Sequence, residues 1–366
     1  MTETIVIGAG PSGLAVGACL RRAGRDVVIL ERAAAVGSSW RNHYERLHLH
    51  TTRRGSALPF RPLPRDWPRY PSRAQVVEYL DDYARAFELA PHFGETVTRA
   101  RRDGEHWHVE TSAGSYDAKN LVIASGYNAR PVRPEFTGEQ QFRGTVVHSS
   151  EYRTAEPYRG KRVLVVGSGN TGAEIALDLC EQGAAGVDLC VRGPIHIVRR
   201  DMFGIPAQTL AVACRWIPRA ILDVMFGWLA RLTVGNLTRY GITRPRMRIL
   251  ASLEDHGRIP MLDIGTVAAI EAGQIRVRPQ IAEFTADGVT FKGREHVAYD
   301  AVVLATGYRP ALDYIEGAGD ALDERGYPRA VASPGLYFIG YRNVATGLLR
   351  EIAREAKRVA SVIAAA

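Results

Sequence analysis

Two glycine-rich loops, each placed between a strand-like run and a helical pattern, constrain the fold of this chain more than any other feature. The first follows the apolar run 4–8 and includes Gly8, Gly10, Pro11, Ser12 and Gly13. A helical pattern comes next, and a second apolar run over 26–30 ends at Glu31. Such glycines let the backbone turn tightly and approach a pyrophosphate at the helix N-terminus, while the acid accepts hydrogen bonds from ribose hydroxyls. The segment therefore predicts a Rossmann-like dinucleotide site.

The second loop repeats this order after the apolar run 162–166. Its residues are Gly167, Ser168, Gly169, Asn170, Thr171 and Gly172, and a helical pattern continues to residue 179. The next strand, predicted over 186–191, is followed by Arg192 rather than by an acid. An arginine cannot accept from a ribose diol, but its guanidinium can bind a 2′-phosphate through paired, charge-assisted hydrogen bonds. The second loop therefore predicts NADPH, and the first predicts FAD, whose ribose is free.

Arg199 and Arg200 follow closely enough in the sequence to assist at the same phosphate. The alternative is that both are solvated surface charges, and the sequence leaves the two interpretations equal.

A buried strand that ends in a small residue, glycine and tyrosine occurs twice, over 121–127 and over 302–308. We interpret these as the strands that lead out of each nucleotide domain. The predicted fold is α/β, with two Rossmann-like, doubly wound domains. The FAD domain comprises 1–155 and the return segment 301–366, and the NADPH domain, 156–300, is inserted into it. A last strand is predicted over 337–340, and a closing helix over 347–365, whose N-terminus can face the flavin ring. Apolar helices over 203–250 either line a substrate pocket or form a subunit contact.

Composition narrows the class of protein. The cysteines, Cys19, Cys180, Cys190 and Cys214, lie far apart, which predicts a reduced compartment, no zinc site, and no redox-active pair of a flavin disulfide reductase. The formal charge of +8 suits an enzyme that handles phosphates, and no nucleic-acid-binding signature accompanies it. Charged and proline residues interrupt the apolar stretch 209–232, so no transmembrane segment is predicted. The first strand leaves no room for a signal peptide, and we expect a cytoplasmic protein.

One further string lies between the two loops. Phe142, Gly144, His148 and Tyr152 match the pattern FxGxxxHxxxY, which resembles the signature of flavin-containing monooxygenases. Baeyer–Villiger monooxygenases carry a variant that ends in Trp, so Tyr152 favours the former. The alternative for His148 is a linker histidine without a special role. Within the family, the chain most resembles the YUCCA branch, plant-type enzymes that convert indole-3-pyruvate to indole-3-acetate. The stretches that carry this resemblance are 44–50, 70–72, 78–85, 262–265 and the region around Gly167 and Asn170.

The resemblance implies a mechanism and a set of contacts. NADPH reduces FAD, O2 adds to the reduced flavin as a C4a-(hydro)peroxide, and bound NADP⁺ and exclusion of water protect this adduct. Cofactor contacts are implied at both loops and at the residues Glu31, Arg32, Trp40, Ser125, Gly126, His148, Arg192, Thr306, Gly307, Tyr308, Gly347 and Leu348.

His50 is the candidate catalytic residue. It occupies the position where many members of the family have an asparagine on the flavin-facing loop, and the YUCCA branch resembles this chain in having histidine there. His50 either donates a hydrogen bond to the flavin edge or the peroxide, or packs beside the flavin. The segment 341–346 departs from the plant pattern, so the substrate can differ.

The sequence leaves more than one reaction open. With an aryl 2-oxo acid such as indole-3-pyruvate, attack on the keto carbon releases CO2. With an amine, a sulfide or an indole carbon, the substrate takes the oxygen directly. An NADPH oxidase or electron-transfer reductase would share both loops without needing the FxGxxxHxxxY string, and a non-enzymatic sensor would leave two intact nucleotide sites unexplained. Expected partners are O2 and a small aromatic or nucleophilic substrate, with a homo-oligomer left open.

Overall fold

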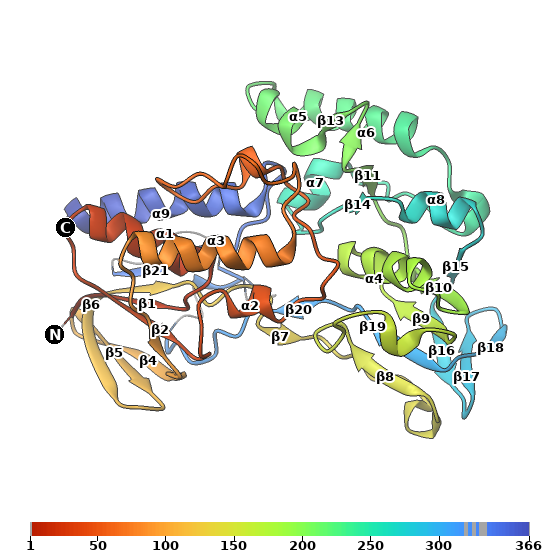
Figure 1. Cartoon of the computed structure of the whole chain (residues 1–366), viewed down its shortest axis with the longest axis horizontal. Helices are drawn as coiled ribbons and strands as arrows, with labels where there is room; N and C mark the ends of the chain where they lie inside the picture. Colours follow the sequence, from red (N-terminus) through yellow and green to blue (C-terminus); the bar gives the residue numbers. More distant parts are fainter. Residues whose placement is uncertain (1, 318–320, 324–326, 329–334, 366) are drawn as a thin grey trace. The chain divides into compact units, whose positions relative to one another are not determined.

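The computed structural model describes residues 2–317, 321–323, 327–328 and 335–365, and the chain divides into two compact units (Figure 1). Unit 1 consists of Met1–Asn42, Thr51–Arg130 and Tyr308–Ala366, and unit 2 consists of His43–His50 and Pro131–Gly307. The chain passes from unit 1 to unit 2 after residue 130 and returns after residue 307. From the sequence, these boundaries were predicted near 155 and 300. Which cofactor each unit binds stays a prediction.

Unit 1 is built on a sheet of order β3-β2-β1-β6-β5-β4, with β21 paired to the end of β6. Strands β1, β2, β3, β6 and β21 run parallel, and β4 and β5 add an antiparallel hairpin. Residues 4–7 of β1 are all buried, as a central parallel strand requires. The bounds are β1 Thr2–Ile7, β2 Val27–Glu31, β3 His92–Phe93, β4 Val97–Asp103, β5 His106–Thr111, β6 Ser115–Ile123 and β21 Leu336–Phe338.

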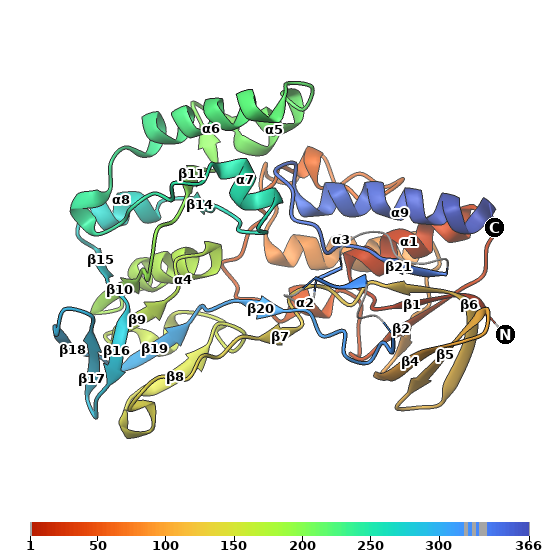
Figure 2. The same cartoon turned by 180° about the vertical axis from the view of Figure 1, so that it is seen from behind.

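Helices α1 (Pro11–Arg22) and α9 (Leu348–Ala365) pack against each other in unit 1, and both views show them side by side (Figures 1 and 2). Pro11 occupies the first turn of α1, where a missing amide costs no intrahelical bond. The closing helix predicted from 347 is thus α9. The shorter α2 (Ser38–Arg41) contacts α3 (Arg73–Ala86), whose start is fixed by a capping box between Ser72 and Gln75.

Unit 2 is built on a fully parallel sheet of order β15-β10-β9-β19-β8. Helix α4 (Asn170–Glu181) packs on β9 and β10. The units β1-α1-β2 and β9-α4-β10 confirm the predicted Rossmann-like α/β architecture. Because β8 pairs with β19, the residues that lead into β8 belong to unit 2, which explains the earlier crossing. The bounds are β8 Thr145–His148, β9 Arg162–Val166, β10 Gly186–Cys190, β15 Ile275–Arg278 and β19 Ala301–Leu304.

Smaller elements complete unit 2. An antiparallel sheet joins β16 (Ile281–Phe284), β17 (Gly288–Phe291) and β18 (His296–Ala298), and β11 (Ile197–Arg199) pairs with β14 (Met261–Asp263), which α8 (Thr266–Glu271) follows.

The segment 203–250 is largely helical, as predicted. The hairpin of β12 (Asp201–Met202) and β13 (Ile205–Pro206) leads to α5 (Ala207–Ala213), α6 (Arg219–Val234) and α7 (Ile249–Glu254). In both views α5 and α6 lie on the side of unit 2 away from its parallel sheet (Figures 1 and 2). Within the described ranges, no helix is both long and apolar enough to cross a membrane.

Candidate functional site

The two glycine loops have nearly the same geometry. Gly10 precedes α1 with φ −81° and ψ −172°, and Gly169 precedes α4 with φ −75° and ψ −178°. A Cβ atom placed on Gly13 would lie 1.8 Å from the carbonyl oxygen of Gly8, and one on Gly172 would lie 1.8 Å from that of Gly167. Each helix therefore begins too close to the end of its strand to accommodate any side chain.

A Cβ atom on Gly10 or Gly169, in contrast, would meet no other atom within 4 Å. Neither residue provides a side-chain cap for the helix that follows. The first-turn amides of α1 and α4 are thus available to an anion, and the helix dipole favours negative charge at that position. Open space above uncapped amides fits the pyrophosphate of a dinucleotide at each loop.

Glu31, at the end of β2, is only 8% exposed. Its carboxylate accepts hydrogen bonds from the backbone amides of Ala9 at 2.7 Å and Ala33 at 2.9 Å. Since each carboxylate oxygen has more than one acceptor position, Glu31 can brace the first loop and still accept from ribose hydroxyls. This geometry fits the role predicted for it.

Arg192, which follows β10, is exposed and forms no ion pair within the described part of the chain. Arg199 is held elsewhere: its Nε donates to the carbonyl of Thr233 at 2.7 Å, and its Nη1 lies 3.6 Å from the Asp263 carboxylate. Arg200 lies 3.5 Å from the carboxylate of its neighbour Asp201. Arg192 is thus the arginine of the three that keeps its guanidinium available for a phosphate.

Helix α4 carries three acids at positions 174, 178 and 181, a spacing that puts them on one face. Glu174 and Asp178 are 2% and 6% exposed. A buried carboxylate is costly unless it is hydrogen-bonded or paired, and each of these acids has a partner from outside the helix. The pairs are His50 Nε2 with Glu174 Oε1 at 2.6 Å, the Tyr152 hydroxyl with Asp178 Oδ2 at 2.6 Å, and the Arg46 guanidinium with both oxygens of Glu181 at 2.9 and 2.7 Å.

Residues 43–50, which we name the α4 strap, supply two of those partners. Tyr44 is buried against Tyr152 with ring centroids 6.3 Å apart, and the amide of Glu45 donates to the carbonyl of Arg153 at 2.9 Å. The strap is one of the stretches that carry the YUCCA resemblance. Its contacts with α4 and with the residues after β8 explain why it belongs to unit 2.

His50 has one ring nitrogen in use and one without a partner. Nε2 lies 2.6 Å from the Glu174 carboxyl group, and an ionised carboxylate only accepts, so in that state Nε2 donates the proton of the bond. Nδ1 is buried and has no hydrogen-bond partner among the described residues. The Glu174 contact therefore fixes the orientation of the ring and leaves Nδ1 for a ligand.

The FxGxxxHxxxY string organises the interior of unit 2. A Cβ on Gly144 would lie 2.5 Å from the Phe142 ring and 2.6 Å from the carbonyl oxygen of Asp300. His148 is 2% exposed, and its Nδ1 accepts from the amide of Ser150 at 3.1 Å. Burial lowers the pKa of His148, assisted by the charge of Arg133. The burial of His148 inside unit 2 and the lowered pKa both favour the neutral imidazole, while its predicted contact with a cofactor stays a prediction.

The other predicted residues lie at the ends of strands and helices. Unit 1 contains Gly8, Gly10, Pro11, Ser12, Gly13, Glu31, Arg32, Trp40, Ser125, Gly126, Tyr308, Gly347 and Leu348, and unit 2 contains His50, His148, Gly167, Ser168, Gly169, Asn170, Thr171, Gly172, Arg192, Thr306 and Gly307. Gly126 and Gly307 both have positive φ, at 80° and 89°, where a side chain would be strained. The Asn170 side chain accepts from the amide of Leu262 at 2.7 Å, which ties the start of α4 to β14.

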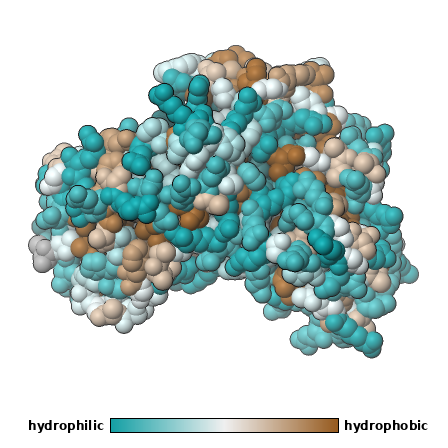
Figure 3. Space-filling model, in the orientation of Figure 1, coloured by the Kyte–Doolittle hydropathy of each residue, from teal (hydrophilic) through white to brown (hydrophobic). Residues whose placement is uncertain are grey.

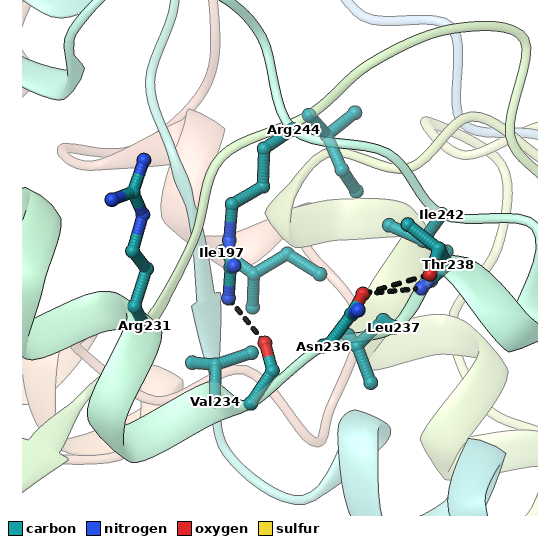
Figure 4. A pocket seen from close by; sticks show the side chains of 10 residues that line it. Ile197, Arg231, Val234, Asn236, Leu237, Thr238, Ile242 and Arg244 are labelled. Atoms are coloured by element: carbon teal, nitrogen blue, oxygen red, sulfur yellow. Dashed lines mark hydrogen bonds between the residues drawn. The ribbon is translucent and has the colours of Figure 1, made fainter.

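A pocket of about 460 Å³ lies in unit 2 beside the end of α6 (Figure 4). Its lining is Ile195, Ile197, Arg231, Val234, Gly235, Asn236, Leu237, Thr238, Ile242 and Arg244. Burial and the charge of Arg231 lower the pKa of Arg244, whose guanidinium donates to the carbonyl of Gly235. None of the sequence-predicted site residues belongs to this lining.

Comparison with known proteins decides the family. A family model described as pyridine nucleotide-disulphide oxidoreductase matches residues 5–201. Indole-3-pyruvate monooxygenase YUCCA1 of Oryza sativa subsp. japonica is 39% identical over 350 residues, covering 92% of this chain and 86% of that protein. Probable indole-3-pyruvate monooxygenase YUCCA8 of Arabidopsis thaliana is 36% identical over 378 residues, covering 98% and 88%. The chain belongs to the YUCCA branch of the flavin monooxygenases.

Solved structures agree with this assignment. A flavin-containing monooxygenase from Stenotrophomonas maltophilia superposes with a TM-score of 0.74 at 26% identity, covering 100% of this chain and 99% of that one. Bacillithiol disulfide reductase from Staphylococcus aureus has a TM-score of 0.71 at 18% identity, with 100% and 98% covered, which shows a shared fold. At that identity the likeness concerns the fold alone, and the flavin monooxygenase described here has no two closely spaced cysteines. It is an FAD- and NADPH-dependent monooxygenase.

Sequence reasoning missed Glu174 and Asp178. The available signal was two acids four residues apart inside an otherwise apolar helix, Ala173–Leu179. Tyr341 was also missed as a contact. Its buried hydroxyl lies 2.9 Å from Ser125 Oγ, and burial raises its pKa well above the usual range.

Alanine at each open glycine should separate the two cofactors. Gly10→Ala and Gly169→Ala add a methyl group where the backbone angles allow it and no protein atom interferes, so both variants should fold. The methyl group would occupy the pyrophosphate position, and crowding of about 1–3 kcal/mol corresponds to about 5- to 150-fold weaker binding. We expect Gly10→Ala to lose FAD affinity and Gly169→Ala to lose NADPH affinity, measured by titration. Equal effects on both cofactors in either variant would contradict the assignment of the units.

Tyr152→Phe should destabilise the protein. Burial raises the pKa of Asp178, and the Tyr152 hydroxyl opposes that rise, so the variant leaves a buried carboxylate without this donor. The free energy of unfolding should fall by about 1–3 kcal/mol at neutral pH, measured by urea denaturation. The deficit should shrink as the pH is lowered, because protonation removes the charge of Asp178. Tyr158→Phe is the matched control, since the Tyr158 ring stacks on Tyr152 without a hydroxyl bond in the described structure. A loss as large in the control would assign the effect to packing.

Proposed function

We propose that this flavin monooxygenase oxidatively decarboxylates an aryl 2-oxo acid, with indole-3-pyruvate as the first candidate. The observation that carries the proposal is near-full-length identity of 36–39% with relatives named for that activity. In the proposed reaction, one oxygen atom of O2 enters the new carboxylate and the other leaves as water. NADPH supplies the two electrons, and the former carboxylate departs as CO2. The four free cysteines support a cytoplasmic location as part of the proposal.

The two glycine loops divide the cofactors in this proposal. Unit 1 holds FAD through the N-terminus of α1 and Glu31, and unit 2 holds NADPH through the N-terminus of α4 and Arg192. Bound FAD, reduced by NADPH, supplies the oxygen-activating chemistry. Ser125, whose hydroxyl contacts Tyr341, and the start of α9 are further contacts expected on the FAD side.

His50 is the proposed catalytic residue and Glu174 its positioning residue. The buried contact at 2.6 Å holds the imidazole through Nε2, and the unpartnered Nδ1 is the atom proposed to hydrogen-bond the reacting groups. Glu174 lies near the start of the helix proposed to receive the pyrophosphate. Its carboxylate would repel that anion, so a partner that can take a positive charge serves both the fold and the ligand.

Substrate dependence tests the reaction class. Indole-3-pyruvate should stimulate NADPH consumption, with O2 use, CO2 release and indole-3-acetate formation in equal amounts and little hydrogen peroxide. Oxygen consumption, product chromatography and a peroxide assay measure these quantities together. Turnover of an amine or sulfide with no response to any aryl 2-oxo acid would move the enzyme to heteroatom oxygenation. Peroxide in place of every product would make it an oxidase.

Loss of the His50–Glu174 contact should uncouple the reaction. In His50→Ala and Glu174→Gln, we expect the ratio of product to hydrogen peroxide to fall about 10-fold, the equivalent of about 1.4 kcal/mol for one hydrogen bond. The Kd for NADPH should change less than this ratio. Glu181→Gln is the control, because Glu181 lies on the same face of α4 with a half-exposed side chain. Unchanged coupling in His50→Ala would assign the histidine to packing.

Arg192→Ala should distinguish NADPH from NADH. Charge-assisted hydrogen bonds contribute roughly 1.5–3 kcal/mol, so the variant should bind NADPH about 10- to 150-fold more weakly. NADH lacks the 2′-phosphate and should bind nearly as before, which provides an internal control for misfolding. Equal losses for the two nucleotides would show that Arg192 has a structural role instead.

A further inference from the structure

Unit 2 exposes a group of large apolar side chains on the hairpin β12–β13, on α6 and on the loop between α5 and α6. The space-filling view shows hydrophobic surface gathered over α5 and α6 (Figure 3). We define the apolar face as Phe203, Trp216, Ile221, Val224, Trp228 and Leu232, of which Trp216 is 80%, Leu232 72% and Trp228 68% exposed. Single exposed apolar residues are ordinary, but a contiguous patch marks an interaction site.

Helix α6 is apolar on two opposite faces. Leu222, Phe226, Ala230 and Val234 are buried at helical spacing and attach the helix to unit 2. Ile221, Val224, Trp228 and Leu232 recur at intervals of three and four residues, which puts them together on the opposite side of the helix, and all are exposed. A surface helix normally places polar residues on its outer face. The packing of α6 within unit 2 therefore does not explain why these four exposed residues are apolar.

Phe203 adds a second observation. It and Gly204 form the turn of the β12–β13 hairpin with φ of 51° and 78°. Such turns favour asparagine or glycine, because a larger residue at positive φ is strained. Here the strained position holds an aromatic side chain that is 72% exposed. Burial of this exposed ring against a partner would offset the strain.

Charge identifies the partner. The segment 203–250 contains seven arginines and a single acid, so it has a net charge of +6 out of the formal +8 of the whole chain. The acid, Asp223, is buried and accepts from the amides of Leu250 and Ala251. Outside the segment, Asp255 pairs with Arg219 at 2.7 Å, and the remaining arginines still give the exposed surface of the segment an excess of positive charge.

We propose that the apolar face docks on the surface of an anionic lipid bilayer. The tryptophans and aliphatic side chains would enter the interface, and arginines such as Arg215 and Arg231 would meet the headgroup phosphates. A second copy of this chain is a poorer occupant, because a face-to-face pair would bring two segments of charge +6 together. The docking is peripheral and does not depend on the proposed substrate.

Vesicle flotation with the FAD-loaded protein tests the proposal. Vesicles of phosphatidylcholine mixed with phosphatidylglycerol should bind the protein, and vesicles of phosphatidylcholine alone should bind it weakly. Binding should weaken between about 0.1 M and 1 M salt, where the Debye length falls from roughly 10 to 3 Å. The double variant Trp228→Glu and Leu232→Glu should bind at least about 10-fold more weakly. Arg215→Gln and Arg231→Gln should each weaken binding about fivefold.

Val362→Glu is the matched control, since Val362 is an exposed apolar residue of α9 outside the segment. It should bind vesicles like the parent protein, and retained binding of both FAD and NADPH in every variant shows that the fold is intact. Absence of binding to anionic vesicles, or binding that survives the double variant, would overturn the proposal. Analytical ultracentrifugation of the same proteins covers the alternative: a dimer abolished by the double variant, without vesicle binding, would assign the face to a second copy.

Discussion

In both units, the fold depends on the approach of a helix start to the carbonyl oxygen at the end of the preceding strand. Gly13 lies against Gly8, and Gly172 against Gly167, at a separation that excludes any Cβ. The amides of Gly8 and Gly167 donate to the carbonyls of Leu30 and Cys190 on the neighbouring strands. These two hydrogen bonds place the first-turn amides of each helix and the residues at the end of the next strand at the same edge of the sheet. That edge is where a doubly wound fold binds its nucleotide.

The two glycine loops differ in the charged residues that lie beside them. In unit 1 the loop amide of Ala9 and that of Ala33 bind Glu31 directly. In unit 2, Arg192 lies two residues beyond the end of β10 and has no ion pair among the described residues, and the acids are on the helix itself. Those acids are held by residues from elsewhere in the chain, because a short helix cannot satisfy three carboxylates on one of its own faces.

The sequence predicted the parts of the molecule that depend on local patterns. The elements β1-α1-β2 and β9-α4-β10 follow from glycine spacing and apolar runs, and so do the residues at the strand ends. The His50–Glu174 contact joins positions 124 apart, and nothing local to 43–50 indicates that the strap leaves one unit for the other. The first boundary was predicted near 155, after the FxGxxxHxxxY string, whereas His148 of that string ends a strand that pairs within the sheet of unit 2. The hairpin turn has Phe203 at a position where asparagine or glycine is usual, so the residue type does not indicate a turn there.

The path of the chain has a consequence for how such a protein can be recombined. Unit 2 is assembled from two separate stretches of sequence, so a gene fragment encoding 131–307 would omit the strap. It would leave Glu174 buried without its imidazole, and a buried polar group left unsatisfied costs about 1–3 kcal/mol, a sizeable part of the stability of an ordinary domain. Exchange of the nucleotide-binding module between relatives must therefore move an eight-residue piece of the N-terminal region together with the helix that it covers. The sequence that must be transferred is therefore discontinuous, although unit 2 is compact in the structure.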